Sequence, residues 1–190
     1  MQDTEHTATR DKERTRKALI DAATQLIAEH GAGVSLADIA ARAGVSKGAL
    51  THHFTSRSAL EDAILSDGAQ RFWNEVHAHV DLSENRPGKL LRGYIRALTS
   101  NSDVMWEICS PTFLILVIGG ERPVQKFLEK DAHAWREAFA ADGIEPATSL
   151  MLRFAAEGLA TATDTPYLTA TELKSARERL LEMTEPTQNL

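Results

Sequence analysis

The residues from 46 to 57 combine basic, hydroxyl and imidazole side chains at positions that one short helix would present on its outer face. Lys47 supplies a cation that suits a phosphate, and Thr51 supplies a hydroxyl and a methyl group that suit base edges. Gly48 costs a helix roughly 0.5–1 kcal/mol relative to Ala, but it lets a backbone approach a large partner closely. These groups predict contact with DNA; the alternative is a helical hairpin with an ordinary solvated face.

Two short helices joined by a tight turn must position these groups. Ser35, with Asp38 three residues later, is placed to cap the first helix, and Gly44 ends it because glycine takes the left-handed conformation freely. Ser46 then caps the second helix. This pattern is a helix-turn-helix, a common DNA-reading unit. The residues that give the two helices and the turn an apolar side are Leu36, Ile39, Ala40, Ala43, Val45, Ala49, Leu50 and Phe54.

This stretch resembles the TetR/AcrR family of one-component transcriptional regulators. The resemblance covers about residues 13–65 and rests on the ordered string S-L-A-D-I-A-x-x-A-G-V-S-K-G-A-L-x-H-H-F-x-S-R-x-x-L. It implies operator binding, with Arg57 against a phosphate. The family usually has Tyr at the position of Thr51, so His52 and His53 are expected to carry more of that contact. The candidate DNA-binding residues are Ser35, Ser46, Lys47, Gly48, Ala49, Thr51, His52, His53 and Arg57.

Charge is distributed unevenly along the 190 residues, although the net charge of −6 alone argues against a nucleic-acid partner. Residues 1–57 hold eight Lys/Arg and seven Asp/Glu, whereas residues 58–190 hold thirteen and twenty. The acidic excess therefore lies outside the helix-turn-helix, where repulsion would keep the second part away from phosphates.

Other features of the sequence indicate a cytoplasmic protein without a membrane partner, and the resemblance implies association with the bacterial nucleoid. No apolar run approaches the ~20 residues of a membrane span, and the polar N-terminus has no apolar signal region. A single cysteine, Cys109, excludes an internal disulfide framework and suits a reducing compartment.

The N-terminal residues precede a helix that is predicted to end near His30. Residues 1–9 are predicted to be disordered. A basic cluster follows, which could lie along the phosphate backbone or enter the minor groove; an equal alternative is a solvated helix start. The cluster consists of Arg10, Lys12, Arg14, Arg16 and Lys17.

No catalytic or metal-binding pattern accompanies these elements. His77 and His79 lie two residues apart on a predicted long helix that Ser56 caps, so they fall on different faces, and H-E-x-x-H and C-x-x-C are absent. We therefore expect no metal, no cofactor and no enzyme activity. An enzyme and a helical adaptor with a vestigial helix-turn-helix are the alternatives, and only Thr51 supports the adaptor.

The second part of the chain is predicted to bind an effector and to dimerise. The acidic excess favours a cationic aromatic or lipophilic effector, although an uncharged or acyl ligand is nearly as well supported. The candidate pocket residues are Trp73, Tyr94, Trp106, Glu107, Phe113, Trp135 and Phe139. Apolar residues surround most of the helix from Pro146 to about Thr163, as an intermolecular four-helix interface requires; the alternative is that this helix and the last one complete the monomer core. The candidate interface residues are Leu150, Met151, Phe154, Ala155, Gly158, Leu173 and Leu180.

Together these observations predict an all-α protein of about nine helices. A three-helix helix-turn-helix domain is expected over residues 1–57, and a helical effector-binding and dimerisation domain over residues 58–190. The resemblance implies a homodimeric repressor that leaves a pseudo-palindromic operator when a small lipophilic or aromatic effector binds.

Overall fold

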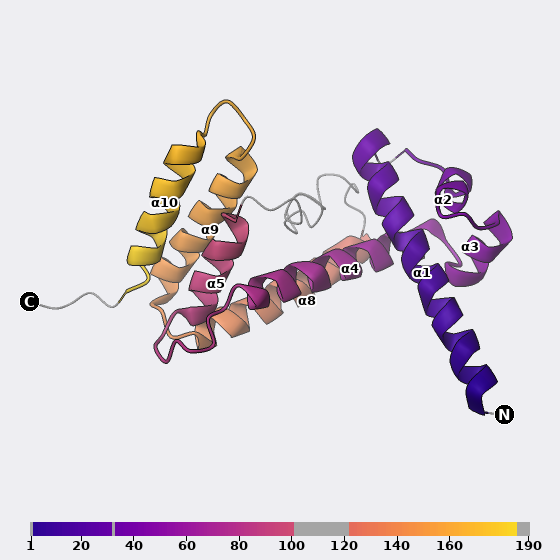
Figure 1. Ribbon diagram of the computed structural model, residues 1–190, viewed down its shortest axis with the longest axis horizontal. Helices are drawn as coiled ribbons and strands as arrows, with labels where there is room; N and C mark the ends of the chain where they lie inside the picture. Colours follow the sequence, from indigo (N-terminus) through magenta and orange to yellow (C-terminus); the bar gives the residue numbers. More distant parts are fainter. Residues whose placement is uncertain (1, 32, 101–121, 186–190) are drawn as a thin grey trace, which may run out of the picture. The chain divides into compact units, whose positions relative to one another are not determined.

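The computed structural model describes residues 2–31, 33–100 and 122–185, and every regular element within these ranges is a helix (Figure 1). The all-α prediction is confirmed, and the eight described helices are close to the predicted number. The helices are α1 (Gln2–His30), α2 (Leu36–Arg42), α3 (Lys47–His53), α4 (Arg57–Ala78), α5 (Lys89–Leu98), α8 (Arg122–Ala141), α9 (Pro146–Ala162) and α10 (Ala170–Glu182).

The chain divides into two compact units. Helices α1, α2 and α3, with α4 up to residue 68 and α8 up to residue 128, belong to the first unit. The remainder of α4 and α8, together with α5, α9 and α10, belongs to the second unit. Both α4 and α8 therefore contribute residues to two hydrophobic cores.

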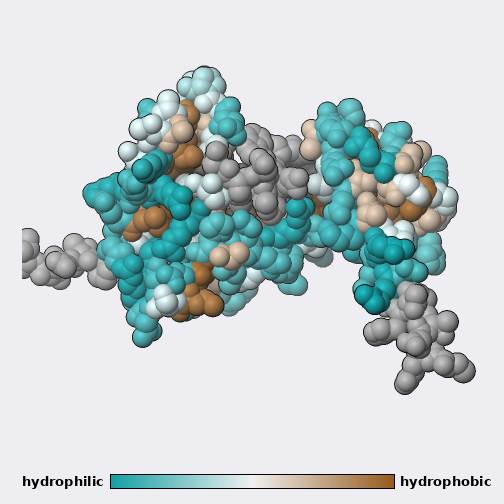
Figure 2. Space-filling model, viewed as in Figure 1, coloured by the Kyte–Doolittle hydropathy of each residue, from teal (hydrophilic) through white to brown (hydrophobic). Residues whose placement is uncertain are grey.

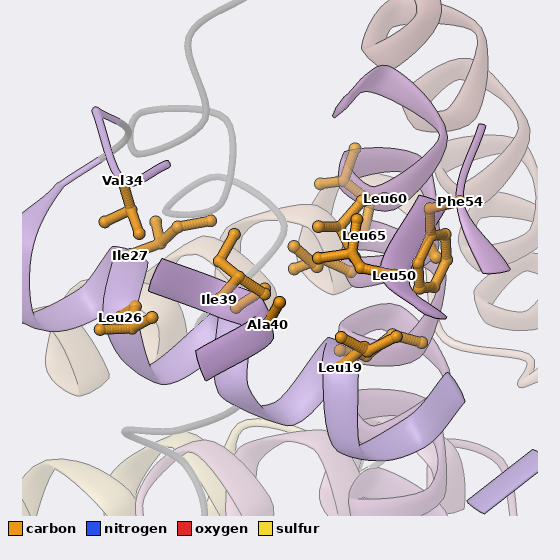
Figure 3. Close-up of a cluster of buried hydrophobic side chains, with 14 residues drawn as sticks. Leu19, Leu26, Ile27, Val34, Ile39, Ala40, Leu50, Phe54, Leu60 and Leu65 are labelled. Carbon is orange, nitrogen blue, oxygen red and sulfur yellow. The ribbon is translucent and has the colours of Figure 1, made fainter. Parts of the chain in front are cut away.

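The first unit has an aliphatic core to which α1, α2, α3 and α4 all contribute. Figure 3 shows these side chains pointing toward one another, with Ile39 from α2 and Leu50 from α3 among them. The turn between α2 and α3 contains Gly44 with φ +69, a left-handed conformation that the sequence predicts there. The close packing holds the two short helices, which would be marginal alone.

The start of α1 differs from the sequence prediction. Residues 2–9 are helical, whereas a disordered tail is predicted for them. The buried residues of α1 begin at Leu19, which anchors the helix in the first core. Once a helix is nucleated, each further residue adds a hydrogen bond at little cost, so α1 extends toward the N-terminus beyond its packed portion. Its end at His30 agrees with the prediction.

The second unit has a core of different composition, in which aromatic residues from α4, α5 and α8 pack with residues of α9 and α10. A charged group is also buried here, because Arg92 of α5 is only 1% exposed. Arg92 Nε pairs with Glu84, Arg92 Nη1 donates to the Pro87 carbonyl (3.0 Å), and Arg96 Nη2 donates to Glu84 Oε1 (2.8 Å). Helical spacing did not predict this ion-pair network.

The visible surface of both units is mostly hydrophilic, with separate hydrophobic patches (Figure 2). In the part of the chain that the structure describes, no helix has the length and apolarity that a membrane crossing needs.

Candidate nucleic-acid interface and effector site

Two serine caps hold the helix-turn-helix, as the sequence predicts. Ser35 Oγ accepts a hydrogen bond from the Asp38 amide (3.2 Å), and the Asp38 carboxylate accepts one from the Ser35 amide (3.3 Å). Ser46 Oγ accepts one from the Ala49 amide (3.1 Å). Each cap satisfies backbone donors that a short helix leaves free at its start. Both helices therefore begin at fixed residues, which orients the outer face of α3.

The predicted contact residues of α3 are mostly exposed. Lys47, Gly48, Thr51 and His52 are exposed, while Ala49 and His53 are partly buried. The Thr51 hydroxyl hydrogen is used within the helix, because Thr51 Oγ1 lies 2.9 Å from the Gly48 carbonyl oxygen. No acidic side chain among the described residues lies within 4.0 Å of the Lys47 amine, so its charge is available to a partner.

Two cations of α1, Lys12 and Arg16, lie beside the end of α3 and are not among the candidate DNA-binding residues predicted above. The Arg16 guanidinium lies 5.1 Å from the centre of the Phe54 ring, and the charges of Lys12 and Arg16 both act on His53. Burial lowers the pKa of His53, and the positive charges of His52, Lys12 and Arg16 lower it further. A basic surface therefore continues from α3 onto α1.

The basic cluster of α1 separates into two kinds of residue. Arg14 pairs with Asp11 (3.1 Å) and Lys17 pairs with Asp21 (3.0 Å), as a solvated helix start would. Lys12 and Arg16 instead sit beside α3, and their spacing of four residues places both on one helix face. Arg10 and Arg14 have the same spacing, so the sequence alone does not single out Lys12 and Arg16.

Arg57, which is predicted to contact a phosphate, makes hydrogen bonds within the protein. Its Nη1 donates to the Val34 carbonyl oxygen, and its Nε donates to Glu61 Oε1 at 2.7 Å. The side chain is 36% exposed. The guanidinium is thus engaged within the protein, at the first turn of α4.

Four of the predicted effector residues come together in the second unit. Trp73, Tyr94, Trp135 and Phe139, together with Phe72, form an aromatic cluster whose neighbouring ring centres lie 4.4 to 5.6 Å apart. The other three predictions, Trp106, Glu107 and Phe113, lie outside the described residues.

Polar groups of α9 border the aromatic cluster. Tyr94 donates a hydrogen bond to Glu157 Oε1 (2.6 Å), and the Arg153 guanidinium lies 4.3 Å from the centre of the Phe139 ring. Burial raises the pKa of Tyr94, and the Glu157 carboxylate raises it further, so Tyr94 stays a neutral donor. Both α9 residues were missed, although their spacing of four places them on one helix face.

The predicted interface residues fall into two groups. On α9, Leu150, Met151 and Phe154 are 49%, 61% and 58% exposed, and Ala155 and Gly158 are exposed too. On α10, Leu173 and Leu180 are each only 8% exposed. Leu180 packs in the second core with residues of α5 and α9, and Leu173 is likewise buried within the chain. They are therefore not available as a contact surface for a second copy.

The two histidines near the end of α4 bind their own helix. His77 Nδ1 lies 2.8 Å from the Trp73 carbonyl oxygen, and His79 Nδ1 lies 3.0 Å from that of Glu75. Among the described residues, no group of three His, Cys, Asp or Glu side chains is arranged to hold a metal ion.

Two family models match this chain. Residues 19–64 match the bacterial regulatory proteins of the tetR family, and residues 88–185 match the tetracyclin repressor-like C-terminal domain. The chain belongs to the TetR family. It is accordingly a transcriptional regulator with a DNA-binding helix-turn-helix. No curated protein matches the chain significantly.

Solved TetR-family structures share the fold over nearly the whole chain. A TetR family member from Streptomyces coelicolor A3 is 29% identical, with a TM-score of 0.65 over 90% of this chain and 99% of that one. The multidrug binding protein EbrR, complexed with malachite green, is 27% identical, with a TM-score of 0.63 over 90% and 98%. A transcriptional regulator from Rhodococcus sp. Rha1 is 23% identical, with a TM-score of 0.68 over 91% and 95%.

Proposed function

We propose that this TetR-family regulator is a homodimeric repressor that leaves a pseudo-palindromic operator when a small lipophilic or aromatic effector binds. The observation that carries the proposal is the outer face of α3, where Lys47, Thr51 and His52 are exposed on a helix capped by Ser46. These side chains match the chemistry of phosphates and base edges in a major groove.

Gly48 supports close contact between α3 and DNA. A Cβ atom added there would meet only Ser46 Oγ, at an ordinary distance of 3.7 Å, so the fold itself would accept alanine. The glycine nevertheless sits in the first turn of α3, where it costs about 0.5–1 kcal/mol. A DNA duplex that must approach the backbone closely would explain why glycine stands here despite this cost to the helix.

The apolar face of α9 supports a homodimer. Leu150, Met151 and Phe154 are exposed side by side on this helix, and a Cβ added at Gly158 would meet nothing within 4 Å. A second copy could cover these groups and approach closely at Gly158. Two reading heads would then contact half-sites about 34–36 Å apart, one helical turn of DNA.

The aromatic cluster supports an aromatic effector. Malachite green, which EbrR binds in its solved complex, is a cationic aromatic dye, and Glu157 supplies a carboxylate beside Tyr94 in this chain. For release of the operator, the effector must bind the DNA-incompetent state more tightly than the competent one. We assign effector binding and dimerisation to residues 58–190 and DNA reading to residues 1–57, at the nucleoid of a bacterial cytoplasm.

Selection of tight-binding duplexes from a random DNA pool tests the proposal. We expect the purified protein to recover an inverted repeat, and malachite green to weaken binding to the recovered duplex. Recovery of no consensus, with only weak and salt-sensitive binding, would contradict operator recognition by the free protein.

The dimer is tested by Phe154→Glu, which would bury a carboxylate in the proposed interface. We expect a monomer by sedimentation, with operator affinity lowered at least a hundredfold because both half-sites are no longer held together. The control is Leu82→Glu, since Leu82 is 84% exposed and lies in the loop between α4 and α5. A Phe154→Glu protein that sediments as a dimer would rule out this face.

A further inference from the structure

Arg57 connects the two ends of the helix-turn-helix. Its Nη1 donates to the carbonyl oxygen of Val34, twenty-three residues earlier, and its Nε donates to Glu61 one turn later in α4. Val34 directly precedes the capping residue of α2, and Arg57 is the first residue of α4. One planar side chain therefore joins the beginning of the motif to the helix that follows it.

The Val34 carbonyl has few other ways to be satisfied. The amide of Asp38, which could reach back to it in the first turn of α2, is already bonded to Ser35 Oγ (3.2 Å). The Val34 side chain is 7% exposed and packs in the first core beside Ile27 (Figure 3). A carbonyl at such a site needs a donor within the protein, because leaving it unpaired is costly.

Glu61 holds the guanidinium in the orientation that reaches Val34. The Nε–Oε1 distance is 2.7 Å, and the two residues are four apart on the same face of α4. Because guanidinium groups are planar, fixing Nε at Glu61 also fixes the direction of Nη1. Lysine could supply the charge but not this pair of directed hydrogen bonds.

We propose that Arg57 is a positioning residue, which fixes the start of α2 against the first turn of α4 and thereby orients α3, rather than a phosphate ligand. The carboxylate of Glu61 offsets its charge, in contrast to Lys47, which has no acidic neighbour among the described residues. The proposal rests on DNA binding by α3, as proposed above.

The experiment compares Arg57→Lys, Arg57→Gln and Glu61→Gln with Lys47→Ala as the matched phosphate-contact control. The probes are the duplex that the wild-type protein selects from a random pool and a scrambled duplex of the same length. Binding is measured across a range of salt concentrations, at a temperature where circular dichroism shows every variant folded.

We expect Arg57→Lys and Arg57→Gln to bind the selected duplex about tenfold more weakly, because the lost hydrogen bonds free α3 from its reading orientation. Binding to the scrambled duplex should change less than about twofold, and the salt slope should stay at the wild-type value. Glu61→Gln should have the same pattern of effects: weaker binding to the selected duplex, with little change in binding to the scrambled duplex or in the salt slope. Lys47→Ala should instead weaken both duplexes and lower the slope by about one.

Hydrogen exchange of the free protein gives a second, DNA-independent measurement. In Arg57→Lys, the amides of residues 35–38 and 57–61 should exchange faster together, while those around Leu19 keep their rate. Equal acceleration throughout the first unit would mean a general loss of stability and would overturn the positioning role.

Two outcomes with DNA would also overturn it. Wild-type affinity in Arg57→Lys, combined with a slope lowered by about one in Arg57→Gln, would make Arg57 a phosphate ligand. Wild-type specificity in both variants would mean that its hydrogen bonds do not orient α3. If the wild-type protein selects no duplex, the proposed function fails, but the hydrogen-exchange comparison still tests the inference.

Discussion

The two units of this chain are stabilised by different kinds of core. Among the described residues, the first core consists almost entirely of aliphatic side chains, and Phe54 is the one buried aromatic ring in it. The second core combines the aromatic cluster with buried charged and hydroxyl groups, including Arg92 and Thr184. The stability of the first unit therefore depends chiefly on close packing, whereas that of the second depends also on charge and on hydrogen bonds.

This difference fits the tasks proposed for the units. A DNA-binding unit binds more specifically when its core has a single rigid packing, because its side chains must meet the DNA in register. An effector-binding unit gains from polar groups and aromatic faces whose partners can be exchanged for a ligand. Substitutions in the two cores should therefore differ in their effects on stability and in the pH dependence of those effects.

The largest effect is expected from Glu84→Gln in the second core. Breaking the pair leaves the Arg92 charge, which is 1% exposed, without its carboxylate, so we expect a loss of about 3–5 kcal/mol of unfolding free energy. Glu182→Gln is the control, because its partner Arg179 is 71% exposed and such pairs contribute little. Urea unfolding followed by tryptophan fluorescence measures both.

The pH dependence of this effect has a definite sign. Burial raises the pKa of Glu84, but hydrogen bonds and charges of Arg96 and Arg92 outweigh it, so the net pKa is lowered. The stabilisation is therefore present above the glutamate pKa of the unfolded chain and is lost as the pH falls through the lowered one. The wild-type protein and Glu84→Gln should converge in acid; a constant difference would contradict the ion pair.

A smaller loss, about 3 kcal/mol, is expected from Leu50→Ala in the aliphatic core, where the side chain is fully buried. Trp73 and Trp135 belong to the second unit, so their fluorescence reports on that unit. We expect circular dichroism to detect early unfolding of the first unit while the tryptophan transition stays in place. Leu82→Ala, at an 84% exposed leucine, should change neither signal.

Tyr94→Phe should cost about 1–2 kcal/mol, because it removes the donor to the partly buried Glu157 carboxylate without changing the ring. The chain supplies its own control, since the other tyrosine, Tyr167, is 90% exposed. Tryptophan-monitored unfolding measures both variants. Equal stability of Tyr94→Phe and Tyr167→Phe would mean that this hydrogen bond contributes nothing net.

Local signals predicted much of the fold. Ser35 and Ser46 cap the helices that they are placed to cap, because capping depends on residues within one turn. The aliphatic core followed from helical spacing for the same reason. The helical conformation of residues 2–9 could not be predicted in this way, because these residues show no apolar spacing that would indicate a packed helix face.

Contacts between residues distant in sequence could not be predicted in this way. Arg57 has the local pattern of an exposed helix start, and only the fold brings the Val34 carbonyl to it. Arg92 lies on an apolar stripe of α5, and its acceptors come from the loop before α5 and from Thr184, just after α10. By its helical spacing, Leu180 fits a dimer interface as well as it fits a monomer core, and only the fold shows that it packs with residues of α5 and α9.

The smallest effect is expected at the edge of the first core, from the titration of His53. Its pKa is lowered by burial and by the charges of His52, Lys12 and Arg16, so the folded state favours the neutral ring. The stability of the first unit is therefore full above the histidine pKa of the unfolded chain and declines as the pH falls through that value toward the lowered one. His53→Gln removes this dependence. Between pH 7 and pH 5, urea unfolding followed by circular dichroism should show a larger loss for the wild-type protein than for the variant. Equal losses would mean that His53 is as well solvated in the folded chain as in the unfolded one.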